Sequence, residues 1–60
     1  MPKIESLVNA SIDAGVTAAI EAIADGDFDL DASDAFYTLQ DESLYLEDFE
    51  DAFNSIMEAE

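Results

Sequence analysis

The sequence predicts an all-α protein, a small three-helix bundle formed by a single domain over residues 1–60. Apolar residues recur at steps of three and four along the first third and the last third of the chain, which is the periodicity of amphipathic helices. Half of the residues are apolar and six are aromatic, so the chain has material for a core. No internal repeat or long linker divides the 60 residues.

The first helix is expected to run from about Pro2 to Ala24. Its apolar positions follow the helical period: Ile4, Leu7, Val8, Ile12, Val16, Ala19, Ile20 and Ile23. Three acids, each eight residues from the next, mark its solvent side: Glu5, Asp13 and Glu21. Proline suits the first helical turn, and Gly26 suits the left-handed residue that closes a helix. Gly15 either weakens this helix or lets another helix approach closely.

Aspartates alternate with other residues after the first helix, at Asp25, Asp27, Asp29 and Asp31. A period of two is typical of extended backbone, which would place the Asp side chains on one face and the apolar residues between them on the other. The sequence therefore predicts an Asp-rich extended loop, with neighbouring Asp residues ~6.6 Å apart.

A short second helix is expected to begin near Asp31 or Ser33, because both residue types are good N-caps. It should end near Gln40 and direct Phe36 and Leu39 inward.

The third helix is expected to be capped by Asp41 or Ser43 and to end near Met57. Its inner stripe would be Leu46, Phe49, Phe53 and Ile56. Its acids would stay outside: Glu47, Asp48, Glu50, Asp51 and Glu58.

The charge balance excludes several functional classes. Sixteen Asp and Glu oppose a single cation, Lys3, for a net charge of −15. Phosphate backbones and anionic membranes are bound through clustered Lys and Arg, so we expect no direct nucleic-acid or membrane binding. The chain has no His and no Cys, which leaves no activated nucleophile and no zinc ligand set. We therefore predict a protein that is not an enzyme and has no cofactor and no dedicated metal site.

Size and composition also bear on stability and location. A chain of 60 residues without disulfides has a small core, so a partner or a homodimer would contribute stability. The longest apolar stretches are expected to be too short to span a bilayer, and the first residues lack the apolar region of a secretory leader. These features favour a cytoplasmic protein.

The acids resemble three known motifs to different degrees. An EF-hand loop beginning at Asp25 matches at three acidic positions but places Leu30 at the required Gly and Phe36 at the required Glu. Residues 41–44, Asp-Glu-Ser-Leu, resemble the Asp-Ser-Leu attachment motif of acyl carrier proteins, but with one residue inserted and too few helices following. Residues 28–31 and 44–49 resemble acidic, aromatic-studded activation domains. An acidic adaptor that docks aromatic helices into a partner groove is thus the alternative function.

The amount of charge points to the preferred function. Solubility requires a net charge of only about 2–8 in a small domain, so the excess here indicates either a high-salt cytoplasm or a surface that imitates a polyanion. A helical domain ~30 Å long compares with a length of B-DNA that carries roughly 18 phosphates.

In size, charge and lack of cations the chain resembles the small acidic DNA mimics of phages and mobile elements, which include anti-restriction and anti-CRISPR proteins and inhibitors of uracil-DNA glycosylase. The resemblance implies a non-enzymatic inhibitor, in the cytoplasm of a bacterial host, that blocks the basic DNA- or RNA-binding surface of a target protein. We predict that the partner is bound by acids of the loop, the second helix and the third helix, with two tyrosines at the edge: Asp25, Asp27, Asp29, Asp31, Asp34, Glu47, Asp48, Glu50, Asp51, Tyr37 and Tyr45.

Overall fold

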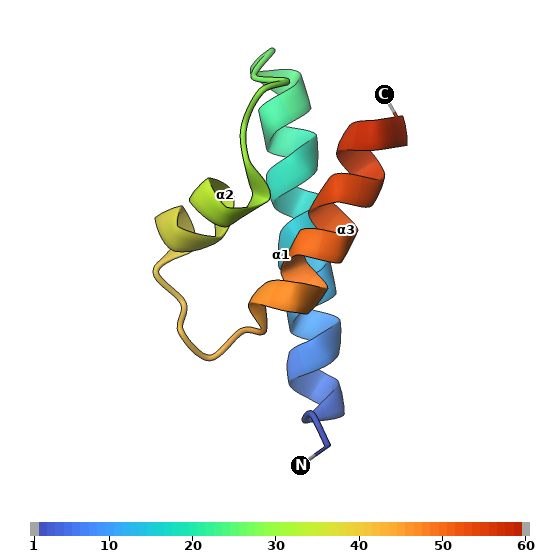
Figure 1. The fold of residues 1–60 in the computed structure, drawn as a ribbon, viewed down its shortest axis with the longest axis vertical. Coiled ribbons are helices and arrows are strands. Elements are labelled where there is room, and N and C mark those ends of the chain that lie inside the picture. The colour runs from blue at the N-terminus through green and yellow to red at the C-terminus, as the bar shows by residue number, and fades with distance from the viewer. Residues whose placement is uncertain (1, 60) are drawn as a thin grey trace.

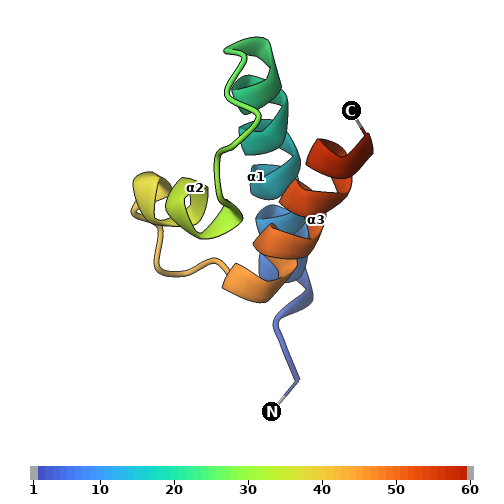
Figure 2. The same cartoon turned by 45° about the horizontal axis from the view of Figure 1, so that its top comes forward.

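The computed structural model describes residues 2–59, which form three helices: α1 (Glu5–Ala24), α2 (Ala32–Leu39) and α3 (Leu46–Ala59). The predicted all-α three-helix bundle is confirmed. α1 and α3 lie side by side and run in the same direction, while α2 lies across them and packs mainly on α3 (Figures 1 and 2). The molecule is elongated and thin, with extents of 37 × 22 × 13 Å.

α1 begins three residues later than expected, at Glu5, because Ile4 has extended backbone angles. The Ile4 carbonyl accepts hydrogen bonds from the amides of Leu7 and Val8, which starts the helix. At the other end Gly26 has a φ of +77°, and its amide donates to the Ile23 carbonyl at 3.0 Å. The predicted role of Gly26 as the left-handed residue that closes the helix is confirmed.

The contact between α1 and α3 is made by small residues on α1: Ser11, Gly15, Ala19 and Ala22 are its buried positions. A Cβ atom at Gly15 would lie 2.5 Å from the Phe49 carbonyl oxygen and 3.0 Å from the Ala52 Cβ. Gly15 therefore lets the backbone of α3 approach closely, which is the second of the two roles expected for it.

The aliphatic residues of α1 do not form the centre of the protein. Ile4, Ile12 and Ile20 are 58%, 41% and 55% exposed, whereas Ala19 is fully buried. The apolar stripe predicted for this helix is therefore not its buried face as a whole: α3 packs on the neighbouring, small-residue face, because bulky side chains would hold the two helices apart.

Aromatic residues of α3 fill the core instead. Phe49 and Phe53 are 0% and 1% exposed, and their rings stack with centroids 6.0 Å apart. Phe36 of α2 meets Phe49 edge-on at 5.2 Å, which couples α2 to this core. Leu39 was expected to point inward, but it is 44% exposed because it lies at the last residue of α2.

The segment after α1 consists of turns rather than extended backbone, so the extended form of the Asp-rich loop is not confirmed. The amide of Asp27 donates to the Ala22 carbonyl at 2.8 Å, and the amide of Leu30 donates to the Asp27 carbonyl at 3.5 Å. The period-two pattern also does not predict burial: Leu30 packs against the core and Phe28 is 62% exposed.

The ends of α2 lie where predicted, at Asp31 and Gln40, but the Asp31 side chain forms no capping hydrogen bond. α3 begins at Leu46, later than expected for a helix capped by residue 41 or 43. The reason is local: the Asp41 carboxylate accepts hydrogen bonds from the amide and hydroxyl of Ser43, at 3.1 and 2.6 Å, and so closes a turn within the loop.

α1 is long and apolar enough to cross a membrane by length and composition, with a mean hydropathy of 1.3. This finding corrects the expectation that every apolar stretch is too short. A core helix of a soluble protein meets the same criterion, so the finding does not assign a location.

Candidate functional site

The charge on the accessible surface is almost entirely negative. Of the fifteen acidic residues between positions 2 and 59, thirteen are exposed, and only Asp48 and Glu50 are half-buried. Against them stands the single cation of the chain, Lys3. A folded surface of this kind attracts cations and basic partners over a distance of about a Debye length, ~8–10 Å at moderate salt.

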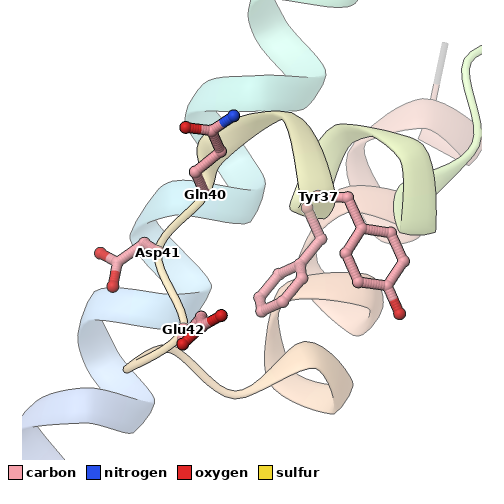
Figure 3. A pocket seen from close by; sticks show the side chains of 5 residues that line it. Tyr37, Gln40, Asp41 and Glu42 are labelled. Carbon is pink, nitrogen blue, oxygen red and sulfur yellow. The ribbon is translucent and has the colours of Figure 1, made fainter.

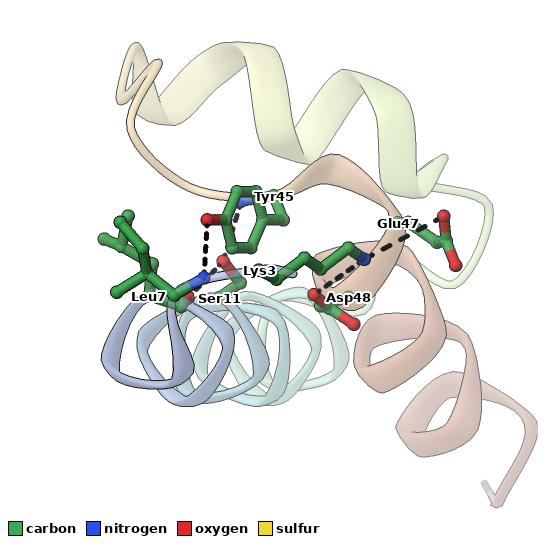
Figure 4. A network of polar contacts seen from close by, with 7 residues as sticks. Lys3, Leu7, Ser11, Tyr45, Glu47 and Asp48 are labelled. Atoms are coloured by element: carbon green, nitrogen blue, oxygen red, sulfur yellow. Dashed lines mark hydrogen bonds and ion pairs between the residues drawn. The ribbon is translucent and has the colours of Figure 1, made fainter. Parts of the chain in front are cut away.

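Lys3 is engaged within the molecule, at the junction between the N-terminal segment and α3 (Figure 4). Its ammonium donates to the Asp48 carboxylate at 3.2 Å, lies 3.9 Å from Glu47, and sits over the Tyr45 ring at 5.4 Å from the centroid. The hydrogen bond to Asp48 raises the pKa of Lys3 above its ordinary value of 10.5. The ammonium thus remains charged near neutral pH and neutralises acids of α3 rather than those of the loop.

Tyr45 and Ser11 extend this junction. The Tyr45 amide donates to the Ser11 hydroxyl at 2.8 Å, and that hydroxyl donates to the Leu7 carbonyl at 2.7 Å. The Tyr45 hydroxyl accepts a hydrogen bond from the Ile4 amide at 3.0 Å. Tyr45, predicted to lie at the edge of a partner interface, therefore joins the start of α3 to the start of α1, and its contact with a partner stays a prediction.

The predicted acidic residues fall into two groups. All five acids of the loop and α2 are exposed: Asp25, Asp27, Asp29, Asp31 and Asp34. On α3, Glu47 and Asp51 are exposed, while Asp48 and Glu50 take part in internal contacts. The Ser33 hydroxyl donates to the Glu50 carboxylate at 3.1 Å, which brings the first turn of α2 against α3. The two acidic segments, separated in sequence, thereby meet at this contact.

The structure adds a cleft that the sequence analysis did not predict. It has a volume of about 430 Å³ and lies between α2 and the loop that follows it, lined by Phe36, Tyr37, Gln40, Asp41 and Glu42. Figure 3 shows the Glu42 side chain on the loop beside α2, with the Tyr37 ring farther away and pointing away from it, while the Asp41 carboxylate turns toward the loop's outer side. Gln40 has a φ of +57°, a left-handed conformation that turns the chain back beside α2. The one signal for this cleft in the sequence is the pair Phe36 and Tyr37, followed four residues later by Asp41 and Glu42.

A second, smaller cleft of about 270 Å³ lies between the end of α1 and α2. Its floor is formed by alanines and Leu30, and Glu21, Asp25 and Asp27 are among its lining residues. Within the described residues, no three acidic side chains are grouped closely enough to hold a metal ion.

Comparison of the chain with protein-family models, with curated proteins and with solved structures finds no match in any of the three. The case for function therefore depends on the chemistry of the molecular surface.

Proposed function

We propose that this protein is a non-enzymatic inhibitor that imitates the charge of a nucleic acid and covers the basic DNA- or RNA-binding surface of a target protein, such as a CRISPR or restriction component. One observation carries the proposal: thirteen carboxylates are exposed, while the single cation is paired with α3. Mutual repulsion among so many like charges destabilises the compact state, so a surface of this composition has a cost that a basic partner would relieve.

The charge density is of the right order for such a role. At one charge per ~1.7 Å of axis, a duplex as long as the molecule, 37 Å, carries about 22 phosphate charges. The chain carries a net charge of −15 over that length, about two thirds of the duplex value. Charge density of this kind depends on the overall length of the molecule and requires no regular spacing between individual Asp side chains.

The loop and α2 acids are the preferred contacts because internal hydrogen bonds engage Asp48 and Glu50. Asp25, Asp27 and Asp29 accept no side-chain hydrogen bond within residues 2–59, so their carboxylates are available to guanidinium and ammonium groups. Association driven by such groups is fast and weakens as salt rises.

An acidic adaptor that docks its aromatics into a partner groove is the second candidate. Phe28 and Tyr37, at 62% and 68% exposed, support it, because neither ring contributes much to the core. The two functions differ in what they depend on. Mimicry depends on carboxylates and salt, whereas groove docking depends on the rings and is nearly insensitive to salt.

The test is capture of partners from bacterial lysate on the immobilised protein, with elution by a salt gradient and by duplex DNA. The proposal predicts a basic nucleic-acid-binding protein that elutes with either. Replacing Asp25, Asp27, Asp29 and Asp31 by Asn should abolish capture. The matched control is E5Q/D13N/E21Q/E58Q, which has the same net charge but keeps all the acids predicted to bind the partner, and it should retain most of the capture. Partners that resist both salt and DNA would refute mimicry and favour the adaptor.

A further inference from the structure

The cleft beside α2 combines two features that recognise the same chemical group. Phe36 and Tyr37 line it with aromatic rings, and Glu42, on the loop, contributes a carboxylate to the same lining (Figure 3). A cation over an aromatic face is stabilised by the ring quadrupole, and a carboxylate pairs with the same cation. The volume of about 430 Å³ falls within the range of ligand-binding pockets, ~300–1,000 Å³.

The aromatic wall is held in place from within the fold. Phe36 packs edge-on against both Tyr37, at 6.0 Å, and Phe49, at 5.2 Å, and Phe49 is fully buried. A ring fixed in this way does not lose much side-chain freedom when a ligand binds, which lowers the entropic cost of binding. The 68% exposure of Tyr37 leaves its ring open to the cleft side and to solvent.

The acids of the cleft are not equivalent. One oxygen of the Asp41 carboxylate accepts two hydrogen bonds from Ser43. Glu42 takes part in no ion pair within residues 2–59 and is exposed. Glu42 is thus the carboxylate available to a ligand, and the Gln40 side-chain amide, at the far edge, offers a neutral acceptor.

We propose that this cleft receives an arginine side chain of the protein whose nucleic-acid-binding surface the chain covers, an inference that rests on the function proposed above. Arginine fits better than lysine because its planar guanidinium stacks on rings while its N–H groups pair bidentately with a carboxylate. Nucleic-acid-binding surfaces carry arginine for phosphate and base contacts. The cleft therefore adds one directional contact to an otherwise diffuse attraction between charges.

The test titrates the isotope-labelled protein with N-acetyl-arginine amide at low salt and follows backbone amide shifts. The expected result is a saturable change confined to residues 36–42, with a dissociation constant on the order of millimolar for a single contact. N-acetyl-lysine amide should bind several-fold more weakly. Tyr37→Ala and Glu42→Gln should each weaken arginine binding several-fold, while Tyr37→Phe, which keeps the ring, should bind like the parent.

Asp13→Asn is the matched control, because it removes the same charge as Glu42→Gln from an exposed position of α1 outside the cleft and outside the predicted binding acids. Equal weakening by these two variants, equal binding of the two amides, or shifts spread over the loop and α3 would each overturn the inference.

The same variants separate this inference from the proposed function. If a basic protein is captured and displaced by DNA, and Tyr37→Ala and Glu42→Gln do not change its capture, the arginine site in the cleft is refuted and mimicry is retained. Selective arginine binding in the cleft without capture of any basic protein would retain the arginine site and refute mimicry.

Discussion

Replacing Gly15 by alanine sets two effects of known size against each other. In a helix interior alanine is more favourable than glycine by ~1 kcal/mol, so helix propensity alone predicts a more stable protein. In the fold, however, the added Cβ would lie 2.5 Å from the Phe49 carbonyl oxygen and 3.2 Å from the Phe53 amide nitrogen. Both are backbone atoms of α3, which cannot rotate away, so the two helices must separate.

Separation of the helices loosens the packing around the fully buried phenylalanines of α3. Overpacking of a core costs roughly 1–3 kcal/mol, and contact with backbone places this case near the upper end. After subtraction of the propensity gain, the expected loss is ~2 kcal/mol. A domain of this size has a stability of only about 3–9 kcal/mol, and the midpoint of thermal unfolding should fall by roughly 8–16 °C.

The assay is urea and thermal unfolding of Gly15→Ala followed by circular dichroism at 222 nm, in enough salt to screen self-repulsion. Thr17→Ala is the control, because Thr17 is an exposed position of α1, and alanine there should stabilise by a few tenths of a kcal/mol. A Gly15→Ala protein at least as stable as the parent, with an unchanged urea dependence, would refute the close-approach argument.

Three further predictions test other parts of the fold. Ala19→Val should destabilise the protein by about 1–3 kcal/mol because Ala19 is fully buried. Ile20→Ser should change stability by at most about 0.5 kcal/mol because Ile20 is 55% exposed. The reverse order in urea unfolding would contradict the assigned face of α1. Ser11→Ala should cost about 1–3 kcal/mol despite the better helix propensity of alanine, since the amide at the start of α3 loses its acceptor; unchanged unfolding would show that this hydrogen bond is dispensable. The pKa of Lys3, followed by ¹³Cε NMR, should lie above 10.5 and return toward that value in Asp48→Asn. Because the folded pKa is raised, the stabilisation from this pair is complete below pH 10.5 and is lost as the pH rises through the folded pKa. A Lys3 pKa that is the same in both proteins would contradict the pairing.

The sequence predicted the elements because their evidence is local. Three- and four-residue periodicity located the helices, a glycine marked the end of α1, and Phe49 and Phe53 were correctly placed on the inner side of α3. The start of α3 was missed because Asp41 forms its own turn instead of capping a helix. Asp and Ser are both favoured as helix N-caps and as turn residues. The sequence alone therefore does not tell which of the two roles Asp41 and Ser43 take.

For the candidate site, too, the sequence predicted some properties and the tertiary structure decided others. The composition fixes the net charge and the presence of a single cation, and hence an anionic surface, whatever the arrangement of the helices. Which carboxylates are available was decided by contacts between distant residues: Lys3 engages Asp48, and Ser33 engages Glu50. No sequence pattern reports such pairs, because their members lie 45 and 17 residues apart.

What the sequence alone determined is therefore the helical fold class, the approximate helix limits and the charge. Tertiary structure decided which face of α1 is buried, since periodicity identifies an apolar stripe but not whether the large or the small apolar side chains meet a neighbour. Here backbone approach at Gly15 favours the small-residue face, and Ile12 and Ile20 remain exposed. It also decided that α2 and the loop after it enclose a cleft, because a cavity is the space between elements and arises only when their relative positions are fixed.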